Sequence, residues 1–92
     1  MKEHVHLELY TRPTCSDCQD AKQYLAEHNI EYTHKDVSAN KDLEKELQKI
    51  SGTRIVPMFA FYQKGLFGRK KLVKHFIGFE VNKAEILDLL SS

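Results

Sequence analysis

The sequence predicts an α/β fold in which a four-stranded mixed sheet is flanked by three helices, with the elements in the order β-α-β-α-β-β-α. Three observations predict this class. Apolar residues alternate near the start of the chain, recur at helical spacing in three later segments, and form one continuous run at residues 58–62. With 92 residues, 41% of them hydrophobic and 29% charged, the chain is expected to fold as a single domain over residues 1–92.

The first three elements follow from local patterns. Apolar and polar side chains alternate over Val5–Tyr10, which predicts a strand with one face more buried than the other. Apolar residues at helical spacing predict a helix from Cys15 to about His28, and Asn29 suits its end because asparagine tolerates the left-handed conformation. Ile30–Val37 is more polar and is expected to form a strand at the edge of the sheet.

The middle of the chain predicts a second helix and a central strand. Ser38–Asn40 is a turn that caps this helix, and Gly52 ends it. The apolar positions of the helix share one face: Leu43, Leu47 and Ile50. The continuous apolar run Met58–Tyr62 suits a strand that is buried on both faces, at the centre of the sheet.

The last third of the chain predicts a hairpin and a final helix. Gly65 and Gly68 bracket a turn before a strand over Leu72–Ile77, and Asn82 with Glu85 resembles a capping box at the start of the helix. The apolar face of this helix consists of Ile86, Leu87 and Leu90. Because the first two strands are joined by a crossover helix and the last two by a short connection, we expect a parallel first pair and an antiparallel last pair.

The chemistry centres on the only two cysteines, Cys15 and Cys18, which lie between the first predicted strand and the first predicted helix. Backbone N–H groups and the positive end of the helix dipole favour the thiolate, which is the reactive form of cysteine. In such motifs the pKa of a cysteine falls from about 8.5 to roughly 3.5–7.5. A disulfide across two residues constrains little chain, so a structural staple is disfavoured. A reversible dithiol, a metal site and two small buried hydrophobes remain as interpretations.

Three segments carry a family resemblance: Tyr10–Cys18, Thr53–Pro57 and Gly78-Phe79. In order and spacing they resemble glutaredoxin, a compact member of the thioredoxin-fold superfamily, and the C-terminal half is also similar to thioredoxin. The resemblance implies a thioredoxin-like, glutaredoxin-type fold and a thiol–disulfide oxidoreductase that acts on disulfide-containing proteins. It also implies that Cys15 is the nucleophile that attacks a target disulfide, and that Cys18 resolves the mixed disulfide.

The resemblance implies a substrate-binding groove as well. Pro57 would be a cis proline, and Val56 would offer its backbone to an extended substrate. Arg12 would stabilise a thiolate or bind a substrate carboxylate, although an exposed, solvated arginine fits the same position equally well. Gly78 matches the first glycine of the segment that holds glutathione in relatives.

Two reductants remain open. In glutathione-using relatives, a basic residue, the residue before the proline and a Gly-Gly followed by an acidic pair hold the tripeptide. Arg12 and Val56 match this pattern, but Gly78–Asn82 lacks the second glycine and the acidic pair. Gly78-Phe79 resembles instead the redoxins that serve ribonucleotide reductase and take electrons from thioredoxin reductase. We therefore expect thioredoxin reductase to be at least as effective an electron donor as glutathione. We also expect no tightly bound cofactor.

The residues between the cysteines, Ser16-Asp17, depart from the family pattern. The negative charge of Asp17 opposes a thiolate, whereas a hydrogen bond from Ser16 would favour it. Because the two effects have opposite signs, the sequence selects no value within the family range of about −200 to −270 mV.

Two other classes of function stay open. The first is a metal-binding module for zinc or iron–sulfur, although the spacing of the five histidines does not match usual zinc sites: His4, His6, His28, His34 and His75. The second is a redox-inert domain that docks partners through the Pro57 groove or a basic hairpin. In a chain of net charge +1, the hairpin concentrates five basic residues: Lys64, Arg69, Lys70, Lys71 and Lys74.

The basic cluster fits a solvated hairpin or a docking patch, and no nucleic-acid-binding motif accompanies it. The sequence has no run of about 18 apolar residues and no apolar block after its first residues. We therefore expect a cytoplasmic monomer that binds neither membrane nor nucleic acid.

Overall fold

The computed structural model describes residues 5–64 and 70–91. Four strands form one sheet in the order β2-β1-β3-β4. Their bounds are β1 (Val5–Thr11), β2 (Thr33–Asp36), β3 (Met58–Lys64) and β4 (Lys70–Ile77). β1 runs parallel to β2 and antiparallel to β3, and β3 runs antiparallel to β4. The predicted mixed sheet is confirmed, with the polar strand at its edge and the continuous apolar strand inside it.

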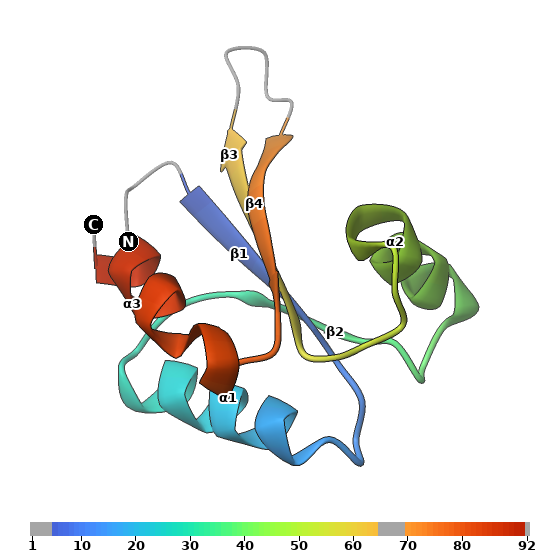
Figure 1. The fold of residues 1–92 in the computed structure, drawn as a ribbon, viewed down its shortest axis with the longest axis horizontal. Coiled ribbons are helices and arrows are strands. Elements are labelled where there is room, and N and C mark those ends of the chain that lie inside the picture. Colours follow the sequence, from blue (N-terminus) through green and yellow to red (C-terminus); the bar gives the residue numbers. More distant parts are fainter. Residues whose placement is uncertain (1–4, 65–69, 92) are drawn as a thin grey trace.

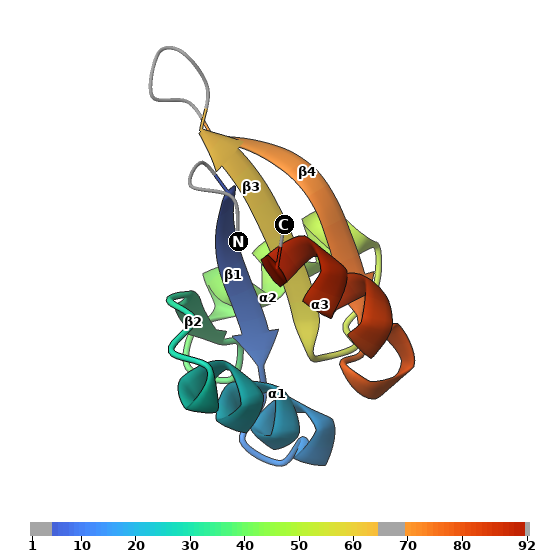
Figure 2. The same ribbon diagram turned by 90° about the vertical axis from the view of Figure 1, so that its left-hand side faces the viewer.

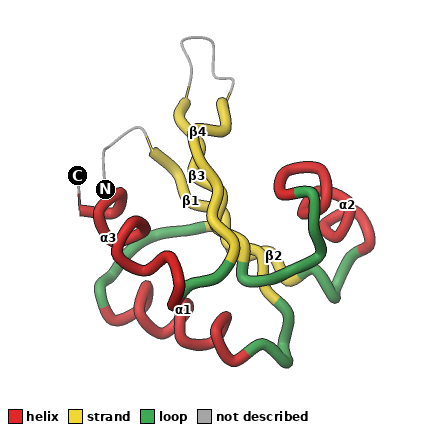
Figure 3. Tube along the Cα trace, in the orientation of Figure 1, coloured by secondary structure: helices red, strands yellow, loops and turns green. Residues whose placement is uncertain are grey.

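Helices cover both faces of the sheet. α1 (Ser16–Glu27) and α3 (Lys83–Ser91) lie on one face, and α2 (Lys41–Ser51) lies on the other (Figures 1 and 2). A short 3-10 helix, η1 (Glu80–Asn82), joins β4 to α3. Figure 3 shows the helices on either side of the twisted strands. Within the described residues, no helix is long and apolar enough to cross a membrane.

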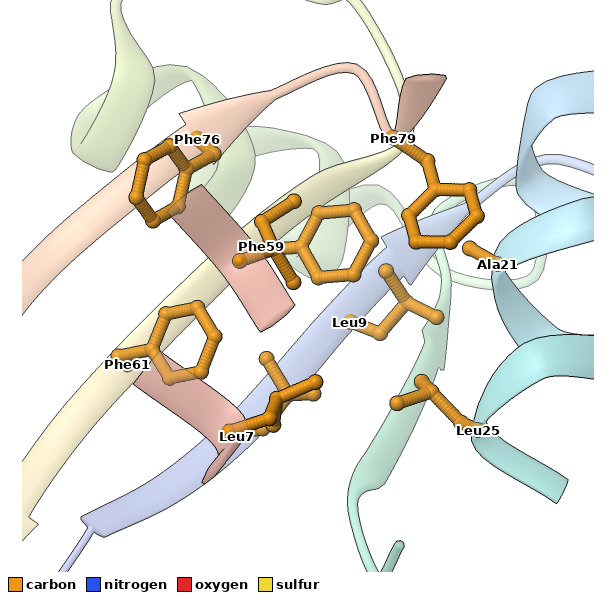
Figure 4. Close-up of a cluster of buried hydrophobic side chains, with 10 residues drawn as sticks. Leu7, Leu9, Ala21, Leu25, Phe59, Phe61, Phe76 and Phe79 are labelled. Carbon is orange, nitrogen blue, oxygen red and sulfur yellow. The ribbon is translucent and has the colours of Figure 1, made fainter. Parts of the chain in front are cut away.

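The larger core lies between the sheet and the helices α1 and α3. It contains Leu7, Leu9, Ala21, Leu25, Phe59, Phe61, Phe76, Phe79, Ile86 and Leu90. Figure 4 shows its four phenylalanine rings beside the leucines of β1. The rings of Phe59 and Phe79 stack with their centroids 5.8 Å apart. Phe79, which lies two residues after the end of the last strand, is therefore held in the core by aromatic packing.

The opposite face of the sheet carries a second core beneath α2, made of Tyr10, Val37, Leu47, Met58, Ala60 and Tyr62. The expected difference in burial between the two faces of β1 is small, because Leu7 to Thr11 are all buried and only Val5 and His6 at its start are not. The alternate position Tyr10 is fully covered, and Glu8 is 4% exposed. The alternation in the sequence shows which side chains of β1 are polar. Whether the polar face is buried depends on α2, which packs over it.

Glu8 is tolerated inside the sheet because two lysines accompany it. Nζ of Lys35 lies 2.8 Å from one carboxylate oxygen of Glu8, and Nζ of Lys70 lies 2.5 Å from the other. Lys35 also pairs with Glu46 of α2, which accepts a hydrogen bond from the hydroxyl of Tyr10. Burial raises the pKa of Glu8, but the two lysines outweigh burial and hold this pKa below its ordinary value.

The helix ends follow local signals. Cys15 caps α1, and beyond its last turn Asn29 has a φ of 54°, the left-handed conformation expected there. Asn40 caps α2 by accepting a hydrogen bond from the N–H of Asp42 at 2.7 Å, and Gly52 ends this helix with a φ of 77°. The expected roles of Asn29, Asn40 and Gly52 at the helix ends are confirmed.

Two expectations are corrected: the cap of the last helix and the length of the edge strand. Asn82 does not cap α3. Its side-chain amide instead donates to the carbonyls of Ile77 (2.7 Å) and Gly78 (3.0 Å), at the turn that follows β4. The edge strand covers only Thr33–Asp36, since the preceding Ile30 and Tyr32 pack against the core. The predicted turn bracketed by two glycines lies outside the described residues.

Candidate redox site

Cys15 and Cys18 are joined by a disulfide at the start of α1, with their Cα atoms 5.2 Å apart. Cys15 is half-buried, whereas Cys18 is fully buried. Cys15 is therefore the sulfur that an incoming partner reaches first. The loop before it is closed by a hydrogen bond from the N–H of Cys15 to the carbonyl of Arg12 (3.3 Å).

The start of α1 is built to favour a thiolate on Cys15. The residue has extended backbone angles, as helix caps do, and its Sγ accepts a hydrogen bond from the N–H of Cys18 at 3.1 Å. Because this N–H belongs to the first turn, it adds to the positive end of the helix dipole. The same donor would stabilise negative charge on Sγ once the disulfide is reduced.

Of the residues implied by the family resemblance, Val56 lies next to this sulfur. The Val56-Pro57 bond is cis, and the carbonyl oxygen of Val56 lies 3.8 Å from Sγ of Cys15. The carbonyl of Pro57 accepts a hydrogen bond from the N–H of Gly78 at 2.8 Å. Val56 thus lies next to Cys15, and Gly78 is joined to the neighbouring Pro57.

Gly78 is required by its conformation and by its neighbours. Its φ is 96°, a region that residues with a Cβ rarely adopt, and a Cβ built there would lie 2.9 Å from Cγ2 of Val81. The turn after β4 can therefore approach Pro57 closely only with glycine at this position.

Arg12 lies beside the site but is engaged by other groups. Its Nη2 donates to Glu44 of α2 at 2.8 Å and to the carbonyl of Arg54 at 3.2 Å, and Nε of Arg54 donates to the same Glu44 oxygen at 3.0 Å. The hydrogen bond from Arg12 is the main reason that the pKa of Glu44 lies below its ordinary value. An open pocket of about 480 Å³ surrounds this group, lined by Arg12, Val37, Ser38, Lys41, Glu44 and Arg54.

Comparison with known proteins places this arrangement in a family. The family model described as glutaredoxin matches residues 7–63, more than half of the chain, including both cysteines and Pro57. The chain belongs to the glutaredoxin family.

Solved structures of this family and of thioredoxins share its fold. A glutaredoxin from Archaeoglobus fulgidus is 19% identical and superimposes with a TM-score of 0.65, over 94% of this glutaredoxin-family chain and 88% of its own. Plasmodium falciparum thioredoxin is 20% identical, with a TM-score of 0.65 over 94% and 70% of the two chains. A Brucella melitensis glutaredoxin is 28% identical, with a TM-score of 0.58 over 95% and 88%. The thioredoxin-like fold is therefore confirmed.

Similar proteins of known name match shorter stretches of the chain. N-acetyl-S-hydroxy-L-cysteine reductase of Bacillus subtilis is 33% identical over 58 residues, which are 63% of this chain and 62% of that protein. Global transcriptional regulator Spx 2 of Bacillus cereus is 40% identical over 42 residues, which are 46% of this chain and 32% of that protein. The chain thus spans about a third of the regulator and less than two thirds of the reductase.

One contact of this glutaredoxin-family site was missed by the sequence analysis. The carboxylate of Asp17 accepts hydrogen bonds from the backbone N–H groups of Phe79 (2.7 Å) and Glu80 (3.3 Å). The partners are separated from Asp17 by 62 and 63 residues, so no local pattern indicates them. An acidic residue in the first turn of a helix was visible in the sequence, but it reads as an ordinary partner of the helix dipole.

The histidines and the basic residues that the sequence singled out have separate contacts in this glutaredoxin-family chain. His6 bonds with Thr33 and His34 with Thr11, and in the described part of the chain no three His, Cys, Asp or Glu side chains gather as metal ligands. Lys70, besides pairing with Glu8, lies over the ring of Tyr62 at 4.5 Å from its centroid. His4 and Arg69 fall outside the described residues.

Proposed function

We propose that the protein is a thiol–disulfide oxidoreductase that reduces disulfides in protein substrates through Cys15 and Cys18. The observation that supports this most is the disulfide at the start of α1, with the more accessible sulfur facing the carbonyl of Val56 beside cis Pro57. A dithiol in that position has a helix start to stabilise a thiolate and the half-buried Val56 beside it to hold a substrate.

The reaction proceeds in two exchanges. The Cys15 thiolate attacks one sulfur of the substrate disulfide, a new S–S bond forms, and the other substrate sulfur leaves as a thiolate that takes up a proton. Cys18, deprotonated, then attacks the Cys15 sulfur and releases the second substrate thiolate. Two electrons pass to the substrate, and the Cys15–Cys18 disulfide remains for a reductant to open.

The burial of the two sulfurs suits these roles. Cys15 is half-buried, so a substrate can reach its sulfur, whereas Cys18 is fully buried and is shielded from outside disulfides. Because Cys18 lies one helical turn after Cys15, it is held within reach of the mixed disulfide. This supports the assignment of nucleophile and resolving cysteine.

Substrate binding is proposed along the segment before β3. Val56 offers its backbone to an extended chain, and the neighbouring Ile55, 58% exposed, offers an apolar side chain to it. Arg12, Arg54 and Lys41 give the adjacent pocket a positive balance against the single carboxylate of Glu44. An acidic group of the substrate fits this pocket, where Arg12 would exchange Glu44 for it.

Thioredoxin reductase is proposed as a reductant at least as effective as glutathione. The two N–H groups at the start of η1, on Phe79 and Glu80, already bind Asp17. They are therefore occupied when a small carboxylate-bearing thiol approaches the dithiol. A protein reductase that docks around Cys15 does not need these two donors.

The test compares two coupled assays with the same disulfide protein as substrate. One contains NADPH and thioredoxin reductase, and the other contains NADPH, glutathione and glutathione reductase. We expect turnover in the first to equal or exceed that in the second, and turnover only with glutathione would reverse the choice of reductant. We expect Cys15→Ser to abolish turnover and Cys18→Ser to accumulate a mixed disulfide. A Cys15→Ser protein that keeps the parental rate would contradict the assignment of Cys15 as the nucleophile.

The same preparations separate the other classes of function. Metal analysis of protein purified under reducing conditions distinguishes a zinc or iron–sulfur module from a dithiol. A Cys15–Cys18 disulfide that reduced thiols cannot open and that oxidised thiols cannot reform would identify a redox-inert docking domain. Because a relative is named N-acetyl-S-hydroxy-L-cysteine reductase, the assay also includes a small oxidised cysteine derivative as a substrate.

A further inference from the structure

Asp17 joins the two ends of the redox site. It lies between the cysteines in sequence and is half-buried, and its two carboxylate oxygens accept the N–H groups of Phe79 at 2.7 Å and Glu80 at 3.3 Å. These donors open the η1–α3 helical segment, while Asp17 itself sits in the first turn of α1. One carboxylate thus accepts hydrogen bonds at the start of η1 and places its negative charge at the start of α1.

The partners of Asp17 are themselves fixed. Phe79 is 2% exposed, and its ring stacks on Phe59 of the central strand β3. Figure 4 shows this ring directed towards α1, with Ala21 beside it. Because the donor lies on a core-anchored residue, the bond holds α1 against a rigid part of the fold.

The contacts close a ring around the disulfide. The carbonyl of Val56 lies 3.8 Å from Sγ of Cys15, and the carbonyl of Pro57 accepts the N–H of Gly78. The next residue, Phe79, donates to Asp17, which returns the ring to the segment between the cysteines. Removing the Asp17 carboxylate opens this ring at one point.

We propose that Asp17 is a positioning residue that holds the cysteine-bearing turn of α1 against the segment after β4 and thereby sets the balance between disulfide and dithiol. The proposal rests on the proposed dithiol function. The bridge restrains the two sulfurs close together, which favours the disulfide. Its negative charge opposes a thiolate in the reduced protein, which also disfavours the dithiol. Both contributions act in the same direction.

Three variants separate the bridge from the charge. Asp17→Asn removes the charge but keeps an amide oxygen that can accept one N–H group. Asp17→Ala removes both. Asp20→Asn removes one negative charge from an exposed position one turn further along α1 and serves as the matched control.

The first measurement is the equilibrium of the Cys15–Cys18 disulfide with reduced and oxidised dithiothreitol. We expect Asp17→Ala to shift this equilibrium towards the dithiol by about tenfold, which corresponds to about 30 mV for a two-electron couple. Asp17→Asn should shift it by a smaller factor, and Asp20→Asn should match the wild type. An Asp17→Ala equilibrium equal to that of Asp20→Asn overturns the proposal.

The second measurement is amide hydrogen exchange at Phe79 and Glu80, followed by NMR in the oxidised protein. We expect faster exchange at both amides in Asp17→Ala and an intermediate effect in Asp17→Asn. Faster exchange without any change in the redox equilibrium would reduce Asp17 to a structural cap and also overturns the proposal.

The two measurements keep the proposals distinct. A wild-type disulfide that dithiothreitol cannot open and oxidised dithiothreitol cannot reform contradicts the proposed function and, with it, the redox role of Asp17. Should Asp17→Ala not fold, Asp17→Asn decides: an equilibrium and an amide exchange both equal to those of the wild type overturn the proposal.

Discussion

The carbonyl oxygen of Val56 lies 3.8 Å from Sγ of Cys15, although 41 residues separate the two in the chain. This proximity brings the backbone before β3 to the more accessible sulfur of the disulfide. In the proposed reaction, a substrate that pairs with the backbone of Val56 would therefore lie beside the sulfur that attacks it.

Gly78→Ala should destabilise the protein more than Gly52→Ala. Both glycines have a positive φ, which costs about 1–2 kcal/mol for alanine. Only at Gly78 does the added Cβ also meet a neighbour, Cγ2 of Val81 at 2.9 Å, and relieving this crowding adds about 1 kcal/mol. Urea denaturation of the two variants measures the difference. The double variant Gly78→Ala/Val81→Ala should recover the crowding part, and no recovery would contradict this reading.

Glu8→Gln should lower the free energy of unfolding at pH 7 by about 3 kcal/mol, because it leaves two lysine charges without their buried partner. The pKa of Glu8 is below its ordinary value in the folded protein, where burial opposes the lowering and the lysines cause it. The stabilisation is therefore present above the unfolded pKa of about 4.3 and is lost as the pH falls through the folded pKa. The gap between variant and wild type should thus shrink in acid.

Glu85→Gln is the matched control for Glu8. Glu85 pairs with Lys74 at 3.9 Å, and its side chain is 65% exposed. Exposed pairs of this kind contribute about 0–1 kcal/mol, so the control should show little change at either pH. Equal effects of the two substitutions in urea denaturation at pH 7 would refute the importance of the buried network.

Tyr10 should remain protonated in strongly alkaline solution as long as the protein is folded. Its hydroxyl is buried and donates to Glu46 at 2.5 Å, and burial first, then the neighbouring carboxylate, raises the pKa of Tyr10 far above its ordinary value. The tyrosinate absorbance of the folded protein at about pH 11, above the ordinary tyrosine pKa of about 10, should therefore be equal in wild type and Tyr10→Phe.

The same shift has a stability consequence. The unfolded chain loses the Tyr10 proton at ordinary alkaline pH while the folded protein keeps it, so the free energy of unfolding should fall as the pH rises above about 10. Tyr10→Phe should weaken this fall, and it should cost about 1 kcal/mol at pH 7 through the lost hydrogen bond. A wild-type absorbance larger than that of the variant before unfolding would contradict the assignment.

Arg12 and Glu44 should have opposite effects on the use of an anionic substrate. Arg12→Ala is expected to raise KM for glutathione disulfide by about threefold, since one charge-assisted contact is lost. Glu44→Gln should lower KM because it releases the Arg12 guanidinium from its 2.8 Å ion pair. Lys49→Ala, on an exposed position of the same helix, is the control for net charge. A KM that falls in both Arg12→Ala and Glu44→Gln would rule out direct substrate binding by Arg12.

Much of the frame of this protein could be predicted from the sequence. Period-two and helical spacings, Asn40 as a cap and Gly52 as a stop are local signals, because the backbone conformation they require depends on the residues themselves and their near neighbours. The cysteine pair at the start of α1 is local in the same sense. The cis bond at Pro57 was expected from the family resemblance, since a proline alone is cis in only about 5–6% of cases in folded proteins.

The remaining features were decided by tertiary packing. Glu8 and Tyr10 become interior residues because α2 covers the second face of β1, which the alternation of that strand does not encode. Arg12 turns to Glu44, and Asp17 reaches Phe79 across 62 residues, because packing against the sheet brings separate helices and loops together. The sequence by itself thus determined the order of the elements and the place of the cysteine pair at the start of α1. Which charges and backbone donors surround that pair was decided by the tertiary fold, because such contacts depend on distances that no local interaction controls.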